Sequence, residues 1–145
     1  PYLIEFNVRM GDPECQVILP RLKTDLFKII NYAVKNELSK VSIKWKKEKS
    51  MTIVLCSKGY PSKYKKNKII KNLNNIKLKK NFSIFHAGTK IENNKILSNG
   101  GRVLNITGVG KKFSNLRSDI IKIIKSINWK GGFYRRDIGW RVIKK

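Results

Sequence analysis

The sequence is poor in cysteine, histidine and acidic residues, and these shortages exclude several classes of protein. Two cysteines, Cys15 and Cys56, and one histidine, His86, are too few for a zinc site or a disulfide framework. We therefore expect a reducing, cytoplasmic environment. Apolar runs stay well short of the roughly 18 residues that a membrane span needs, and residues 1–5 show neither a charged leader nor a small-residue cleavage site. Neither a membrane span nor a secretion signal is expected.

The shortage of acidic residues leaves the chain strongly basic. Nine acidic residues against 33 basic ones give the 145 residues a formal net charge of +24. Such a charge opposes compaction, and it is typical of proteins that bind phosphates. Hydrophobic residues nevertheless make up 41% of the chain and occur in periodic stretches, so we expect a folded core of one domain or slightly more rather than wholesale disorder.

The type of basic residue argues against selection for nucleic-acid binding. Lysine, asparagine and isoleucine, which share A/T-rich codons, account for 26, 14 and 20 of the residues, a pattern that indicates mutational bias. The lysine-rich run over residues 63–80 contains a single aromatic residue, Tyr64, whereas single-strand binders interleave aromatic side chains that stack on bases. A solvated surface is the simpler interpretation. A basic nucleic-acid-binding module stays open as an alternative function.

The seven arginines carry more information than the lysines. A planar guanidinium binds a carboxylate or phosphate through two parallel hydrogen bonds, which lysine cannot do. Four arginines, Arg9, Arg102, Arg135 and Arg136, stand beside glycine-containing loops, where a backbone can approach a ligand closely. We take these four as candidate ligand-binding residues.

Hydrophobic periodicity predicts an α+β fold. Residues 2–9 alternate as a strand with one apolar face does. Asp12, Pro13 and Glu14 fit the start of a helix, with Asp12 as its cap. The pattern further predicts helices over residues 25–36 and 113–127, strands over 41–46, 50–57, 82–89 and 102–109, and turns at 93–94 and 99–101. The change from a helical to a strand-rich pattern near residue 40 predicts a structural boundary there.

Three polar residues share one face of the first predicted strand. Glu5, Asn7 and Arg9 are spaced two residues apart, so their side chains project from the same side. A carboxylate and an amide oxygen are hard ligands suited to Mg²⁺ on nucleotide phosphates, and a guanidinium can stabilise charge on a transferred phosphoryl group. The spacing alone favours an ordinary strand with one polar, solvent-facing side. The turn that follows leads into a helix N-terminus, whose free amides can hold an anion.

Five separated blocks of sequence resemble the glycinamide ribonucleotide synthetase (phosphoribosylamine–glycine ligase) family of the ATP-grasp superfamily. They are LIEFNVRMGDPECQ at residues 3–16, the stretch from residue 50 to KGYP at 58–61, FHAGT at 85–89, GGRVLN at 100–105 and GFYRRDIG at 132–139. Met10 departs from the Phe or Leu usual in the family, a tolerable swap between apolar residues. The resemblance covers nearly the whole chain, but only the C-terminal third of the family's length.

The resemblance implies a fold, a division into domains and an activity. It implies that residues 1–40 end an ATP-grasp domain and that 41–145 form a small domain of mainly antiparallel strands with flanking helices. Family members are carbon–nitrogen ligases of purine biosynthesis that use ATP and Mg²⁺ or Mn²⁺ to join glycine to 5-phosphoribosylamine through glycyl phosphate. We expect the chain alone to be inactive, with the family's N-terminal part as its partner and with neither membrane nor specific nucleic-acid partners. A catalytically inactive relic is the alternative.

The resemblance also implies roles for individual residues. Glu5 and Asn7 match metal ligands, Arg9 a residue that stabilises transition-state charge or orients a carboxylate, and Asp12 one that meets the amine of glycine or of the ribosylamine. Arg135 and Arg136 match a loop that grips a ribose 5-phosphate, and Gly100, Gly101 and Arg102 are expected to help from the opposite side. A hairpin turn with a surface arginine remains the alternative at 100–102.

Overall fold

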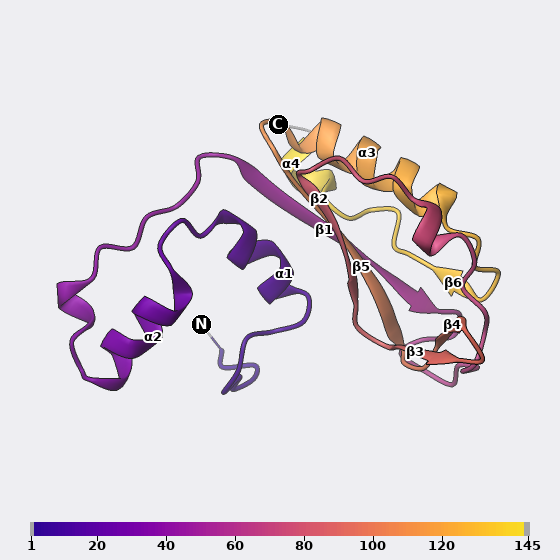
Figure 1. The fold of residues 1–145 in the computed structure, drawn as a ribbon, viewed down its shortest axis with the longest axis horizontal. Helices are drawn as coiled ribbons and strands as arrows, with labels where there is room; N and C mark the ends of the chain where they lie inside the picture. Colours follow the sequence, from indigo (N-terminus) through magenta and orange to yellow (C-terminus); the bar gives the residue numbers. More distant parts are fainter. Residues whose placement is uncertain (1, 144–145) are drawn as a thin grey trace.

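The centre of the protein is a four-stranded antiparallel sheet (Figure 1), seen in a computed structural model that describes residues 2–143. Its strand order is β2-β5-β1-β6, with β1 over Lys49–Ser57, β2 over Phe82–His86, β5 over Arg102–Gly110 and β6 over Gly132–Phe133. Helix α3 (Phe113–Ser126) lies along one face of this sheet. The α+β class, with mainly antiparallel strands and flanking helices, is therefore confirmed.

The hydrophobic core lies between the sheet and α3. On this face β1 and β5 alternate apolar residues, and Ile53 stands opposite Ile106 while Leu55 stands opposite Leu104. Three residues of α3 spaced four apart, Leu116, Ile120 and Ile124, are buried against them, as the apolar stripe of residues 113–127 predicts.

The opposite face of the sheet is more polar and meets the N-terminal part of the chain. Thr52 and Thr107 are buried there side by side, and the Thr107 hydroxyl donates to the Thr52 hydroxyl at 2.8 Å. Helix α1 (Glu14–Ile18) contacts both β1 and β5, so residues around it lie against the sheet rather than apart from it. This contact positions the candidate site described below.

A second, two-stranded sheet follows β2 as a hairpin. Strands β3 (Thr89–Glu92) and β4 (Lys95–Ser98) pair in antiparallel register around Asn93 and Asn94. Both asparagines have positive φ, 49° and 58°, the left-handed conformation that a tight hairpin turn requires and that asparagine tolerates. The predicted turn at residues 93–94 is confirmed.

The remaining helices are short. Helix α2 (Leu26–Val34) begins where residues 25–36 predict a helix, and the Asp25 carboxylate caps it by accepting from the backbone amide of Lys28 at 2.9 Å. The other pieces are η1 (Leu19–Arg21), η2 (Leu38–Lys40), η3 (Leu73–Asn75) and α4 (Trp140–Ile143). None of the helices within residues 2–143 has the length and apolar character to cross a membrane.

Two predicted strands are wrong. Residues 2–11 form irregular backbone, and the side chains that should have made an apolar strand face, Tyr2, Ile4, Phe6 and Val8, are exposed. Residues 41–46 also lack a ladder within the described chain, apart from one bridge between Trp45 and Leu22. The alternating pattern reports only which side chains can share a face, whereas a strand also needs a hydrogen-bonded neighbour.

Ile120 tests the packing of α3 on the sheet. Because its side chain is completely buried, we expect Ile120→Ala to lower the free energy of unfolding by about 2–5 kcal/mol, since the truncation leaves a cavity. Urea denaturation measures the change. Lys122→Ala, on the exposed side of the same helix, is the control and is expected to change stability by less than about 1 kcal/mol. Equal losses from both variants would contradict the described packing.

Candidate functional site

Polar side chains distant in sequence converge on the carboxylate of Asp12. Arg102 Nε lies 3.1 Å from Asp12 Oδ2, and Arg102 Nη1 donates to the Asp12 backbone carbonyl at 3.1 Å. Asn105 Nδ2 donates to Asp12 Oδ1 at 2.9 Å, and Gln16 Nε2 reaches the same oxygen at 3.3 Å. Asp12 was expected to cap the first helix. Instead its carboxylate faces the sheet, and Pro13 precedes α1 without a side-chain cap.

An irregularity in the sheet places Arg102 on the face that meets Asp12. Leu55 stands opposite Leu104, but the next residue of β1, Cys56, stands opposite Arg102, so Val103 is an extra residue in β5. With regular alternation Arg102 would share the core face with Leu104. The bulge turns it to the face of Asn105 instead, a known use of bulges beside functional sites.

The site is half open to solvent and has a buried floor. The side chains of Asp12 and Arg102 are 33% and 41% exposed, whereas Asn105 beneath them is completely buried. Burial raises the pKa of the neighbouring Cys56 thiol, an effect that the Arg102 charge opposes and the Asp12 charge reinforces. This shift favours the protonated, less reactive form of the Cys56 thiol.

Gly100 and Gly101 have clear packing roles beside Arg102. The carbonyl of Gly100 accepts from the Ser57 hydroxyl at 2.8 Å, and the carbonyl of Gly101 accepts from the Ser57 amide at 2.7 Å. A Cβ at position 101 would lie 2.1 Å from a ring carbon of Tyr60, so only glycine fits there. These contacts tie the start of β5 to the end of β1. Ligand binding by residues 100–102 stays a prediction.

The C-terminal loop over residues 134–139, which carries Arg135 and Arg136, begins at the same end of the sheet as Arg102. In β6, Phe133 stands opposite Cys56, which in turn stands opposite Arg102 on the other side of β1. Two strand spacings therefore separate the backbones of Arg102 and Phe133, about 10 Å. The structure thus brings the predicted ligand-binding residues of 100–102 and 135–136 to one end of the sheet.

Contacts within the C-terminal loop hold its backbone, while the side chains of Arg135 and Arg136 are both exposed. Arg117 of α3 donates from Nε to the Ile138 carbonyl at 3.0 Å and from Nη2 to the Arg136 carbonyl. Arg135 Nε donates to Asp137 Oδ1 at 3.1 Å, and this hydrogen bond lowers the pKa of the Asp137 carboxyl. Arg136 lines a hollow of about 370 Å³ together with Trp129 and Tyr134, among others.

The three candidates nearest the N-terminus are not assembled with the Asp12 cluster. Glu5, Asn7 and Arg9 are exposed on the irregular segment, and Arg9 Nη1 donates to the carbonyl of Met10 at 3.1 Å. Across residues 2–143, no three His, Cys, Asp or Glu side chains form a group that could hold a metal ion. The oxygens of Glu5 and Asn7 nevertheless fit Mg²⁺ chemically, because this ion commonly binds a few protein oxygens and completes its shell with phosphates and water.

Sequence reasoning missed Asn105 as a site residue, although it lies in one of the blocks that carry the resemblance. It is a polar residue within an apolar stretch, between Leu104 and Ile106, and both neighbours are fully buried. A polar side chain at such a position is unusual and needs a hydrogen-bonding partner. The composition of the strand was therefore a usable signal, but it did not identify Asp12 as the partner.

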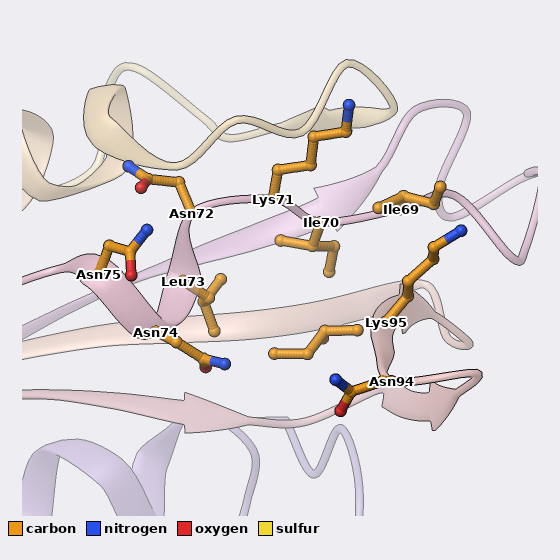
Figure 2. Close-up of a pocket in the computed structure, with 10 residues that line it drawn as sticks. Ile69, Ile70, Lys71, Asn72, Leu73, Asn74, Asn75, Asn94 and Lys95 are labelled. Atoms are coloured by element: carbon orange, nitrogen blue, oxygen red, sulfur yellow. The ribbon is translucent and has the colours of Figure 1, made fainter.

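A separate hollow of about 450 Å³ lies beside the β3–β4 hairpin (Figure 2). Ile70 and Leu73 point toward its middle, while Asn74 and Asn94 lie at its lower side and Lys71 points away. Its lining residues, 69–75 and 94–96, include none of the candidate residues predicted from the sequence. It is therefore distinct from the Asp12 cluster.

Comparisons with known proteins agree on one family. The family model described as "Phosphoribosylglycinamide synthetase, C domain" matches residues 50–141. The chloroplastic phosphoribosylamine–glycine ligase of Arabidopsis thaliana is 46% identical over 147 aligned residues, which cover 100% of this chain and 28% of that protein. The phosphoribosylamine–glycine ligase of Brucella melitensis is 42% identical over 100% of this chain and 34% of its own length.

More distant relatives extend the same pattern. The trifunctional purine biosynthetic protein adenosine-3 of Gallus gallus is 40% identical over 99% of this chain and 14% of its own length. The crystal structure of phosphoribosylamine–glycine ligase from Thermotoga maritima matches with a TM-score of 0.69 and 30% identity, covering 94% of this chain and 33% of that one. The chain thus spans about a third or less of the length of these relatives.

An acid titration of the Asp137 carboxyl tests its hydrogen bond with the Arg135 guanidinium. Removing the guanidinium in Arg135→Ala is expected to raise the pKa of the Asp137 carboxyl toward its ordinary value, because the hydrogen bond that stabilises the ionised form is lost. NMR detection of the carboxyl carbon during an acid titration measures the shift. Arg136→Ala is the matched control and should leave the titration of Asp137 in place. An unchanged titration in Arg135→Ala would show that the two side chains do not pair.

Proposed function

This chain belongs to the phosphoribosylglycinamide synthetase C-domain family, and we propose that it is the C-terminal part of an ATP-dependent ligase that joins glycine to 5-phosphoribosylamine. The observation that carries the proposal is the 40–46% identity, over essentially the whole chain, to proteins named as this ligase or as a trifunctional purine biosynthetic protein. The resemblance drawn from the five sequence blocks is thereby confirmed. The cytoplasm is the proposed site of action.

The proposed reaction consists of two transfers. The γ-phosphoryl group of ATP passes to the glycine carboxylate, which gives glycyl phosphate and ADP. The amine of 5-phosphoribosylamine then attacks the activated carbonyl carbon, the C–O bond to phosphate breaks, and the amine loses a proton. The products are glycinamide ribonucleotide, ADP and phosphate. Positioning and stabilisation of negative charge are what the protein must supply.

The candidate residues fit these requirements at two places. We assign Asp12 to the amine side of the reaction and Arg9 to charge on the transferring phosphoryl group. Arg135 and Arg136 are assigned to the ribose 5-phosphate, because both side chains are exposed and a guanidinium can form two parallel hydrogen bonds to phosphate. For Arg135 this binding exchanges its hydrogen bond to Asp137 for one to phosphate. Residues 100–102 lie at the same end of the sheet, which supports a shared substrate-binding region.

Glu5 and Asn7 are the proposed metal ligands. Their oxygen donors suit Mg²⁺ or Mn²⁺, which when bound would neutralise charge on the phosphates of ATP. Their present exposure is consistent with ligands that await further partners from substrate and from the rest of the enzyme. We propose that residues 1–40 end the ATP-grasp domain and that residues 41–145 form the C-terminal domain.

Exposed apolar side chains near the N-terminus support a contact between this segment and another part of the ligase. Tyr2, Ile4, Phe6 and Val8 are between 84% and 99% exposed, and Phe27 on α2 is 78% exposed. Large apolar side chains exposed to this degree favour burial against other protein. We propose that the preceding part of the ligase covers it and completes the nucleotide pocket.

The activity of the isolated chain tests the proposed division of labour. We expect the 145 residues alone to release no ADP from ATP in the presence of glycine and 5-phosphoribosylamine, because the nucleotide pocket is assigned to the missing part. A coupled assay for ADP detects turnover. Adding the N-terminal part of a related ligase as a separate polypeptide should restore it. Turnover by the isolated chain would refute the assignment.

Substitutions in a complete ligase carrying these residues test the individual roles. Glu5→Gln and Asn7→Ala are each expected to weaken metal-dependent formation of glycyl phosphate by more than about tenfold, since each removes or weakens a ligand.

Arg135→Lys is expected to raise KM for 5-phosphoribosylamine about tenfold and to change kcat little, because one charge-assisted hydrogen bond is lost. Steady-state kinetics with varied metal and substrate separate the two effects. Parent-like kinetics in a variant would remove that residue from the site.

A further inference from the structure

The buried amide of Asn105 is directed at Asp12 rather than at a neighbour within the sheet. Its neighbours on the same face, Thr52 and Thr107, satisfy each other through a 2.8 Å hydrogen bond and through the backbone. Asn105 Nδ2 instead reaches Asp12 Oδ1 at 2.9 Å, across 93 residues of sequence. The sheet therefore holds a donor whose partner is a candidate site residue.

Burying this amide has a cost that an apolar residue would avoid. Asn105 is completely buried, and its Oδ1 accepts no hydrogen bond from any residue that the structure describes. An unpaired buried carbonyl oxygen is unfavourable, whereas valine or leucine would fill the position without that cost. The contact with Asp12 is the compensating gain that the structure shows.

We propose that Asn105, together with Arg102, is a positioning residue that fixes the Asp12 carboxylate to receive the ammonium group of glycine. This inference rests on the proposed function and specifies the substrate group that meets Asp12. Arg102 was predicted to bind substrate directly. Its Nε and Nη1 are engaged with the side chain and backbone of Asp12, so the structure favours an indirect role.

The hydrogen bonds on Asp12 leave room for one more donor. A carboxylate has about four lone-pair positions. Arg102 occupies Oδ2, while Asn105 and Gln16 both donate to Oδ1. The side chain is one-third exposed, so a small substrate can reach the remaining position from the solvent side. An ammonium group is the complementary donor because it is cationic and carries only hydrogen-bond donors.

The contacts of Arg102 and Asn105 with Asp12 depend on the bulge at Val103. Arg102 and Asn105 are three positions apart, a spacing that places side chains on opposite faces of a regular strand. The extra residue in β5 brings both to the Asp12 face, so that each carboxylate oxygen is held by a different side chain. Rotation of the carboxylate is thereby restricted before substrate arrives, which lowers the entropy lost on binding.

The experiment uses the complete ligase and compares Asn105→Ala with Thr107→Val. Thr107 is buried on the same strand and face but bonds to Thr52, so it reports the purely structural cost of removing a polar group there. We expect Asn105→Ala to raise KM for glycine five- to tenfold, with KM for ATP and 5-phosphoribosylamine within twofold of the parent enzyme. Thr107→Val should leave all three KM values within twofold.

Arg102→Lys is the second variant, and it decides the matter if Asn105→Ala does not fold. Its side chain is 41% exposed, and lysine keeps the charge while losing the two-point contact with Asp12. We expect the same selective rise in KM for glycine. Parent-like KM for glycine in the folded variants, an equal rise for all substrates, or a rise confined to 5-phosphoribosylamine would overturn the proposal.

The parent ligase, without substitutions, distinguishes failure of the positioning role of Asn105 from failure of the proposed ligase function. If it releases ADP in a glycine-dependent manner while the variants behave like Thr107→Val, only the positioning role fails. If the parent enzyme itself shows no glycine-dependent ADP release, the proposed ligase function fails, and the assignment of Asp12 to glycine fails with it.

Discussion

The antiparallel pairing of β1 with β5 is the interaction on which the rest of the structure depends. Its apolar face, with Ile53 opposite Ile106, forms the floor on which α3 packs. Its other face holds Asn105 and Arg102 against Asp12. One ladder thus supports the hydrophobic core and the candidate site at once. A slip of one residue in register would exchange the two faces and destroy both.

The bulge in this ladder places Arg102 in the candidate site instead of in the hydrophobic core. Regular alternation would direct Arg102 into the core, where an unpaired guanidinium is strongly unfavourable. The extra residue at Val103 directs it instead to Asp12, while Val103 itself stays fully buried. The Asp12 carboxylate is consequently bound by residues 90 and 93 positions away along the chain. This link also joins the N-terminal segment to the central sheet.

Charge has a smaller role here than the net value of +24 suggests. The contacts that define the candidate site involve Arg102, Asn105 and Gln16, and Arg117 holds the backbone of the C-terminal loop at Arg136 and Ile138. Planar guanidinium and amide groups give directed hydrogen bonds, whereas lysine is a flexible point charge. Arg102, one of the four arginines selected from the sequence, was therefore a better indicator of the candidate site than the 26 lysines.

The sequence by itself determined the α+β class, the helix over α3, the Asn93–Asn94 turn and the family, because local periodicity, turn chemistry and contiguous motifs carry these features. It did not determine whether residues 2–9 pair as a strand, since pairing needs a neighbour that local pattern cannot supply. Only the tertiary structure decided that Asn105 and Arg102 hold Asp12. That contact depends on a bulge and on chain packing across some 90 residues, neither of which leaves a periodic trace in the sequence.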